Sequence, residues 1–417
     1  MPLSPLRTEL YNGATLLVKR STTTPAVAIT LTMRAGSIAD PPGLAGATWL
    51  LSRAIDRGTA TRSAAEIAEQ LDSRGITLTI LVTRHAFSIG CRCLADDFAP
   101  VLALLGDIAM SPSLPEEELA TRKGEVITSI RQDEDNPAIR ATEALMSQLY
   151  PDDHPYGRQT KGSIDVVERL TRAQLLALHA ERFAPSELTA VIVGDVEPAQ
   201  ARHEMERVFG GWRKPAPPPL TVPPVTPAAE RRRIVIPMMN KSQADIAYGF
   251  TTITRNDPAY YAFWLMNVAF GQYAIGGRLG DSIRERQGMA YYVSSALDAN
   301  LAPGPLTIRA GVSPANVDRA VASIDEEVVR LVRDGLTPQE LDESRRYLIG
   351  SIPRALETNG AIANFLQTGE FFGLGLDYDA RLPDLLTAVT LEDVHAAARR
   401  VLDPDRATVV IAGPYQG

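Results

Sequence analysis

A predicted helix near the N-terminus carries a polar stripe with the spacing of a metal site. Residues 46–59 read GATWLLSRAIDRGT, and their apolar side chains recur every three or four residues, as in an amphipathic helix. The polar stripe consists of Trp49, Ser52, Arg53 and Asp56. This spacing suits two metal ligands and a general base, but the residue types suit neither role. The alternative is a solvated helix face on which Arg53 pairs with Asp56 while Trp49 packs partly buried.

A second candidate pair lies in the C-terminal half, in the stretch IRERQGMAYYV. We expect Arg284 on the last turn of a helix, Gly288 as the left-handed residue that ends it, and Tyr291 at the start of the next strand. The alternative is a surface ion pair for the arginine and a core position for the tyrosine. Just upstream, GQYAIGGRLG predicts a flexible turn that contacts substrate, with Gln272 and Tyr273 in it.

The composition carries no sign of a nucleic-acid or membrane partner. The 42 basic and 50 acidic side chains give a net charge of −8 without a basic block, which argues against nucleic-acid binding. The opening MPLSPLRTEL does not resemble a signal sequence, and no apolar run is long enough to span a membrane. We therefore expect a cytoplasmic protein, unless a signal peptide has been removed.

Neither the cysteines nor the histidines suggest a metal site. Cys91 and Cys93 alternate within a predicted strand, so both point to one face, where they are poorly placed to bond to each other and are expected in the core. The five histidines are scattered, with no two at helical ligand spacing. We expect no metal in this chain.

The elements that position these residues occur twice. A proline-rich linker, residues 214–230, separates a domain at 1–213 from a domain at 231–417. Both halves end with a threonine-capped helix, a break at a proline and a strand that ends in glycine. At a constant offset, the matched residues include Thr171/Thr390, Pro185/Pro404 and Gly194/Gly413. This register indicates a tandem duplication.

In each half, the sequence pattern predicts strands and helices that occur in groups rather than in strict alternation. The first half has a hairpin around Asn12 and Gly13, helices near 43–57 and 62–73, a strand region at 76–94, and further helices near 96–110 and 115–133. The second half repeats this plan. We therefore expect an α+β fold of two homologous domains, each with helices packed on a largely antiparallel sheet.

Several blocks of the chain resemble the pitrilysin/insulinase family of metallopeptidases. They include LYNGATLLVKR, the stretch MRAGSIADPPGLAGATWLLSRAIDRGT, HPYGRQTKGS and GRLGDSIRERQGMAYYVSS, and they cover nearly the whole chain in order. Within this family, the blocks most resemble the short two-domain branch, which includes the subunits of the mitochondrial processing peptidase and paired bacterial peptidases.

The resemblance implies that the helix that binds zinc in the family lacks its zinc ligands and general base in this chain. The family motif H-x-x-E-H supplies two zinc ligands and a general base, and a distant glutamate supplies a third ligand. These positions fall on Trp49, Ser52 and Arg53, and on Ser129 for the distant glutamate. By the same resemblance, Arg284 holds the main chain of a substrate and Tyr291 supports its oxyanion, both acting in the active site of a partner subunit.

The resemblance thus implies a non-catalytic, peptide-binding subunit of a heterodimeric zinc peptidase, inactive alone. Its partner would be a homologue with an intact H-x-x-E-H motif, and the zinc would lie in that partner. Substrates would be peptides bound extended at a sheet edge. Two alternatives are a purely structural subunit, like the core subunits of the respiratory cytochrome complex, and a stand-alone peptide-binding protein.

Overall fold

The computed structural model describes residues 2–151, 153–273 and 276–417. Contacts divide the chain into two compact units. Unit 1 consists of Met1–Ile130, Gln159–Thr221 and Ile352–Ala380; unit 2 consists of Arg131–Arg158, Val222–Ser351 and Arg381–Gly417. Residues 214–230 form neither helix nor strand.

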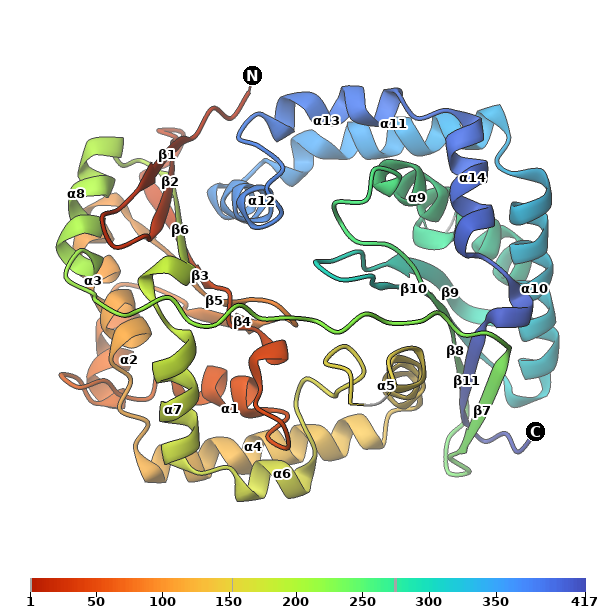
Figure 1. Cartoon of the computed structure of the whole chain (residues 1–417), viewed down its shortest axis with the longest axis horizontal. Coiled ribbons are helices and arrows are strands. Elements are labelled where there is room, and N and C mark those ends of the chain that lie inside the picture. The colour runs from red at the N-terminus through yellow and green to blue at the C-terminus, as the bar shows by residue number, and fades with distance from the viewer. Residues whose placement is uncertain (1, 152, 274–275) are drawn as a thin grey trace. The chain divides into compact units, whose positions relative to one another are not determined.

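Unit 1 is built on a six-stranded sheet in the order β1-β2-β6-β3-β5-β4 (Figure 1). Its strands are β1 (Leu6–Glu9), β2 (Thr15–Arg20), β3 (Ala26–Met33), β4 (Thr79–Val82), β5 (Phe87–Leu94) and β6 (Leu188–Gly194). All pairs are antiparallel except β2 with β6. The helices that begin in this unit are α1 (Ala47–Ala54), α2 (Ala64–Asp72), α3 (Phe98–Met110), α4 (Glu116–Glu134), α6 (Ile164–Arg169), α7 (Arg172–Arg182), α8 (Pro198–Phe209), α12 (Asn359–Phe371) and α13 (Tyr378–Thr387).

Unit 2 contains a five-stranded sheet in the order β7-β11-β8-β10-β9. Its strands are β7 (Arg232–Pro237), β8 (Ala244–Thr251), β9 (Ala290–Leu297), β10 (Pro305–Val312) and β11 (Thr408–Gly413). The helices of this unit are α5 (Pro137–Leu149), α9 (Tyr260–Asn267), α10 (Val317–Asp334), α11 (Pro338–Ala355) and α14 (Leu391–Val401), with π-helical turns η4 (Val268–Gln272) and η5 (Gly280–Arg286). Both sheets have one parallel pair in the same relative place, β2 with β6 and β7 with β11. The α+β fold class is confirmed.

The matched ends of the two halves have the same local geometry. Thr171 and Thr390 each form a capping box at the start of α7 and α14. Gly194 ends β6 at a φ of +146° and Gly413 ends β11 at a φ of +143°. A Cβ at Gly194 would lie 2.1 Å from the carbonyl oxygen of Ala26, so only glycine fits there.

One helix of each half packs on the sheet of the other half. α5 precedes the linker but contacts β8 and β11 in unit 2, and α12 follows the linker but contacts β3 and β6 in unit 1. The division at residues 213 and 231 therefore describes the sequence repeat, whereas the compact units are discontinuous along the chain. Periodicity alone carries no signal for such an exchange.

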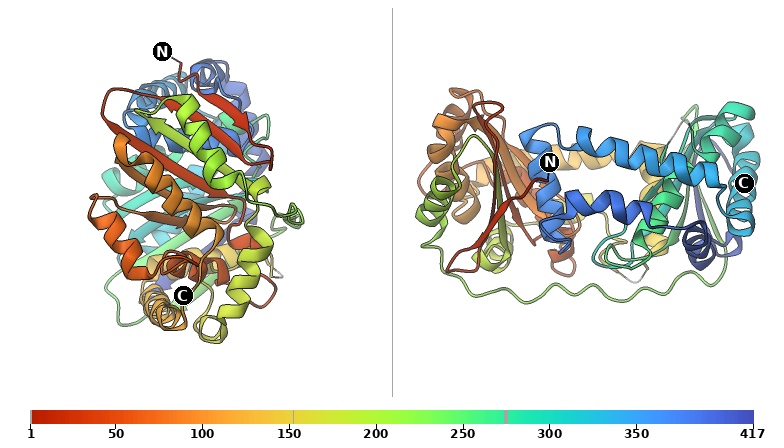
Figure 2. Two further views of the ribbon diagram at one scale, coloured as in Figure 1. Left: turned by 90° about the vertical axis from the view of Figure 1, so that its left-hand side faces the viewer. Right: turned by 90° about the horizontal axis from the view of Figure 1, so that it is seen from above.

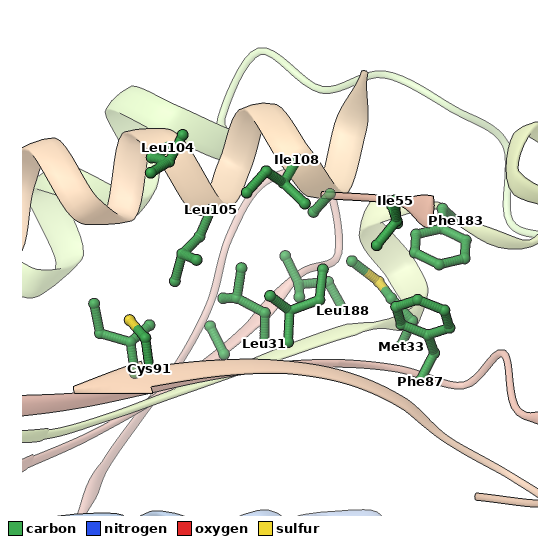
Figure 3. Close-up of a cluster of buried hydrophobic side chains, with 14 of the residues drawn as sticks. Leu31, Met33, Ile55, Phe87, Cys91, Leu104, Leu105, Ile108, Phe183 and Leu188 are labelled. Carbon is green, nitrogen blue, oxygen red and sulfur yellow. The ribbon is translucent and has the colours of Figure 1, made fainter. Parts of the chain in front are cut away.

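Different helices cover the two faces of the sheet in unit 1. Helices α3 and α8 cover one face, where alternate strand residues such as Leu31, Met33 and Phe87 meet Leu105 and Ile108 of α3 (Figures 2 and 3). Burying such side chains stabilises the unit by about 25 cal/mol for each Å² of apolar surface removed from water. On the opposite face, α12 packs on β2, β6 and β3.

Cys91 and Cys93 are free and buried on the core face of β5, as the alternation predicted. Burial raises the pKa of Cys91 to about 12 and that of Cys93 to about 11. Both thiols therefore stay protonated at neutral pH, which makes them core residues rather than nucleophiles or metal ligands.

We predict that Gly194→Ala lowers the free energy of unfolding of unit 1 by about 2 to 4 kcal/mol, because the added Cβ meets the backbone at a φ that alanine avoids. Thermal unfolding followed by circular dichroism measures the effect. Gly124→Ala in α4 is the matched control, since a Cβ there would meet no neighbouring residue within 4 Å and the helix gains up to about 1 kcal/mol. Equal melting temperatures for the two variants would contradict the account.

Candidate functional site

Helix α1 is held at its first turn by a buried carboxylate and a tight backbone contact. Asp40, which is 4% exposed, accepts hydrogen bonds from the backbone N–H groups of Gly46 and Thr48, each at 2.7 Å. Gly46 has a φ of +94°, and a Cβ there would lie 2.4 Å from the carbonyl oxygen of Lys161. Gly162 meets Ala45 in the same way, at 2.1 Å. Two glycines thus allow the loop at 161–162 to pack directly on the start of α1.

The side chains of the polar stripe are not all exposed to solvent, as they would be on a solvated helix face. Ser52 is only 5% exposed, and its hydroxyl donates a 2.6 Å hydrogen bond to the carbonyl of Trp49. Arg53 is exposed; its charge acts on Asp56, as the alternative expects, but the close ion pair of Asp56 is with Arg57, at 3.2 Å. Burial raises the pKa of Asp56 despite the arginine beside it. Ser52 and Asp56 of the stripe are therefore packed into unit 1, whereas Arg53 faces solvent.

A lysine ammonium lies between the positions of the expected ligands. Lys161 Nζ donates a 2.8 Å hydrogen bond to Ser129 Oγ on α4. The same nitrogen lies 5.8 Å from the centroid of the Trp49 ring on α1, within the range of a cation–π contact. One positive charge thus contacts both helices that the resemblance assigns to zinc binding.

These residues do not fit a zinc ion. Zinc takes imidazole, thiolate or carboxylate ligands, and the four positions hold an indole, two hydroxyls and a guanidinium. The ammonium of Lys161 adds a positive charge at Ser129, where a cation would be repelled. Glu125, one turn before Ser129, pairs instead with Arg122 at 2.6 Å. Residues 2–151, 153–273 and 276–417 contain no cluster of three metal-ligating side chains.

The second candidate pair lies in unit 2 at the junction of η5 and β9. Arg284 is on the π-helical turn η5, Gly288 follows at a φ of +62°, and β9 begins at Ala290, so the expected local structure is confirmed. The guanidinium of Arg284 is 43% exposed and lies 3.7 Å from Glu285. Tyr291 is 69% exposed, and its hydroxyl has no hydrogen-bond partner in the described part of the chain. Its expected alternative as a core residue is therefore wrong.

The next residue along β9 behaves in the opposite way. Tyr292 is partly buried, and its hydroxyl donates a 2.6 Å hydrogen bond to the carboxylate of Asp245. Burial and this bond raise the pKa of Tyr292. Because successive residues of a strand point to opposite faces, β9 presents one tyrosine to solvent and fixes the other to its own unit.

The glycine-rich stretch upstream is described only in part. Ala274 and Ile275 lie outside the described residues. Gln272 accepts a 3.1 Å hydrogen bond from Asn267, and the ring of Tyr273 lies 4.9 Å from that of Tyr347. These two tyrosines line a cavity of about 420 Å³. The expected contact with substrate stays a prediction.

Sequence reasoning missed two features of unit 1. It assigned no role to Lys161, which lies on a loop far along the chain from α1. It also missed a cleft of about 830 Å³ beside β4, the edge strand that pairs with β5 alone in the described sheet. The only available signal for the first was the pair Lys161-Gly162, and no local pattern indicated the second.

Comparisons with known proteins agree with this fold and locate the chain in a family. Residues 15–162 match the family described as insulinase (peptidase family M16), and residues 169–348 match the peptidase M16 inactive domain. The chain belongs to the M16 peptidase family, in its short two-domain form. The predicted membership of the pitrilysin/insulinase family is therefore confirmed.

Several relatives align over nearly the whole chain. An uncharacterized zinc protease of Streptomyces coelicolor is 25% identical over 98% of this chain and 90% of its own length. YmxG of Bacillus subtilis, also an uncharacterized zinc protease, is 25% identical over 97% of this chain and 98% of its own length. A solved M16 inactive-domain structure from Pseudomonas fluorescens has 26% identity and a TM-score of 0.91, covering 99% of this chain and 98% of that one. Among the described helices, none has the length and apolar character that a membrane crossing requires.

We predict that the purified wild-type chain holds far less than one zinc ion per chain and hydrolyses no peptide. The reason is the set of side chains at positions 49, 52, 53 and 129, none of which is a zinc ligand or a carboxylate base. Metal analysis after dialysis against zinc, together with a peptide hydrolysis assay, measures both. Near-stoichiometric zinc that chelators remove together with activity would refute the prediction.

A graft of the family ligands separates the effect of Lys161 from that of the substituted ligands. We predict that the chain with Trp49→His, Ser52→Glu, Arg53→His and Ser129→Glu binds zinc at least about a hundredfold more weakly than the same chain with Lys161→Met added, because the ammonium repels the cation. Calorimetric zinc titration measures both. Lys123→Met in α4, which removes an ammonium that donates to the carbonyl of Glu168, is the matched control and leaves affinity unchanged. Equal affinities with and without Lys161 would contradict the account.

Proposed function

We propose that this chain is the non-catalytic, peptide-binding subunit of a heterodimeric M16 peptidase, and that it completes the active site of a homologous partner. The observation that carries the proposal is the contrast between two sites. The zinc position of unit 1 contains Lys161 bound to Ser129, whereas Arg284 and Tyr291 of unit 2 remain exposed. The chain has lost one half of an active site and kept the other.

The first site accounts for the loss of catalysis by this chain. Peptide hydrolysis of this kind needs an activated water and a base, which the partner's zinc and glutamate would supply. Ser52 cannot replace the glutamate, because its hydroxyl is buried and bonded to the carbonyl of Trp49. The catalytic group must therefore come from another chain.

The second site would supply an oxyanion donor and a substrate-binding group to the active site of the partner. Tyr291 has an exposed phenol without a partner in the described chain, so its O–H is available to the oxyanion of a substrate. Among the described residues, Arg284 contacts Glu285 at 3.7 Å, and its planar group of donors can hold the carbonyl oxygens of an extended peptide. Neither group needs to be released from a strong internal bond.

Unit 1 supports the binding of a peptide in extended form. β4 is an edge strand, since it pairs with β5 on one side and ends the sheet order on the other. The exposed backbone groups of an edge strand accept an added strand, and main-chain hydrogen bonds then provide affinity largely independent of sequence. The substrate class is therefore unfolded peptide segments.

Kinetics of the reconstituted heterodimer test the roles of the two exposed side chains. We predict that Tyr291→Phe lowers kcat by about a hundredfold, since one oxyanion donor is lost while the ring stays. Arg284→Ala raises KM and lowers kcat, because the substrate is held out of line.

Each variant has a matched control of the same residue type close by in the sequence. Tyr292→Phe removes a hydroxyl that binds Asp245, and Arg286→Ala removes a guanidinium that pairs with Asp281 at 3.0 Å. Both controls keep wild-type kinetics at a temperature where the fold is intact. If Tyr291→Phe and Arg284→Ala assemble normally and also cleave at the wild-type rate, the chain is a structural scaffold and the proposal is wrong.

A further inference from the structure

The cleft of unit 1 lies on the face of the sheet that α12 leaves partly uncovered. On this face, the apolar side of α12 packs against the buried outer residues of β2, β6 and β3. These contacts join Ile362, Ala363 and Leu366 to Leu17, Ala28, Val191 and Val193. Beside this packing, residues of α12, β3, β5 and β4 line the cleft of about 830 Å³. The cleft therefore adjoins the edge strand where a peptide is expected.

The cleft is lined mainly by small and hydrogen-bonding groups. Its floor includes Thr30 of β3 with Ser88 and Gly90 of β5, and its wall includes Asn364 and Gln367 of α12. The side-chain oxygen of Gln367 is buried and has no hydrogen-bond partner in the described residues. An unpaired buried amide oxygen costs free energy, and a polar ligand in the cleft would recover it.

Arg92 is the only charged residue among those that line the cleft. It is exposed, and neither an ion pair nor a hydrogen bond joins its guanidinium to another described residue. A Cβ at Gly360, in the first turn of α12, would lie 3.8 Å from Cδ of Arg92. The aliphatic part of the arginine thus rests against α12, and the guanidinium stands at the cleft without an internal carboxylate.

The strand register gives Arg92 a defined place relative to a bound peptide. Thr79 and Leu81 of β4 pair with Gly90 and Ser88 of β5, and all four line the cleft. Arg92 is the next residue of β5 on the same face, beyond the first residue of β4. A peptide strand added to β4 alternates its side chains, so every second one faces the cleft, and those near the start of β4 lie nearest to Arg92.

We infer that this cleft is a subsite that selects an extended peptide with a carboxylate near the start of β4, held by Arg92. The inference rests on the proposed function and adds a preference to it. A guanidinium binds a carboxylate through two parallel hydrogen bonds, whereas it has no such match with an amide or an ammonium group. The carboxylate is that of an acidic side chain or of a peptide C-terminus.

Binding of defined peptides to the full chain tests the subsite. The probe is a soluble peptide about ten residues long, enough to cover an edge strand, with a neutral fluorophore at its N-terminus. One arm compares glutamate with glutamine at each position in turn, with an amidated C-terminus. A second arm compares a free with an amidated C-terminus in the glutamine peptide. Fluorescence anisotropy at low ionic strength gives Kd for each.

We expect one acidic form to bind about three- to tenfold more tightly than its amide, and salt to reduce the difference because the pair is exposed. Arg92→Ala removes the preference but leaves the affinity of the amide peptide unchanged, and Arg92→Lys restores only part of it. Arg202→Ala, which removes an exposed arginine of α8 paired with Glu206, is the matched control and keeps the preference.

The outcomes separate this inference from the proposed function. Equal Kd values for every acid and amide pair, with peptide bound, would overturn the carboxylate subsite and leave peptide binding intact. A preference that persists in Arg92→Ala would also overturn it. If the wild-type chain binds none of the peptides, peptide binding itself fails, and the subsite fails with it.

Discussion

A positive charge held between α1 and α4 limits the chemistry available to unit 1. The ammonium of Lys161 binds Ser129 and faces the ring of Trp49, and its backbone packs on the first turn of α1. That packing requires glycine at positions 46 and 162, so the lysine is placed by the backbone and not only by its flexible side chain. A half-buried ammonium therefore contacts both helices to which the resemblance assigns the zinc ligands.

The two halves of the chain repeat one sheet plan with different side chains at the candidate sites. The two sheets share a topology, with the same parallel pair, the same glycine at the end of β6 and β11, and an edge strand in β4 and β9. The shared features maintain the fold and are close to identical in geometry. The side chains at the candidate sites differ, since a fold does not by itself determine the residues of a site.

The types and order of the elements were largely predictable, because they follow from local periodicity, caps and glycines. The positions of α1, β9 and the capping threonines were read from patterns a few residues long. The exchange of α5 and α12 between the two halves of the sequence was not predictable, because an amphipathic helix does not specify which sheet it covers. The same limit applies to the candidate sites. The local geometry of Arg284 and Tyr291 was predicted, but the position of Lys161 depends on contacts between segments far apart in the chain.

In the proposed function, this chain works only with a homologous, zinc-carrying partner. Native mass spectrometry of the complex isolated from its own cells, through a small tag on this chain, tests that dependence most directly. The account predicts a particle of one copy of this chain and one copy of a homologue with an intact H-x-x-E-H motif, with zinc that remains with the homologue when the two are separated. Recovery of this chain alone, or only with further copies of itself, would contradict the account.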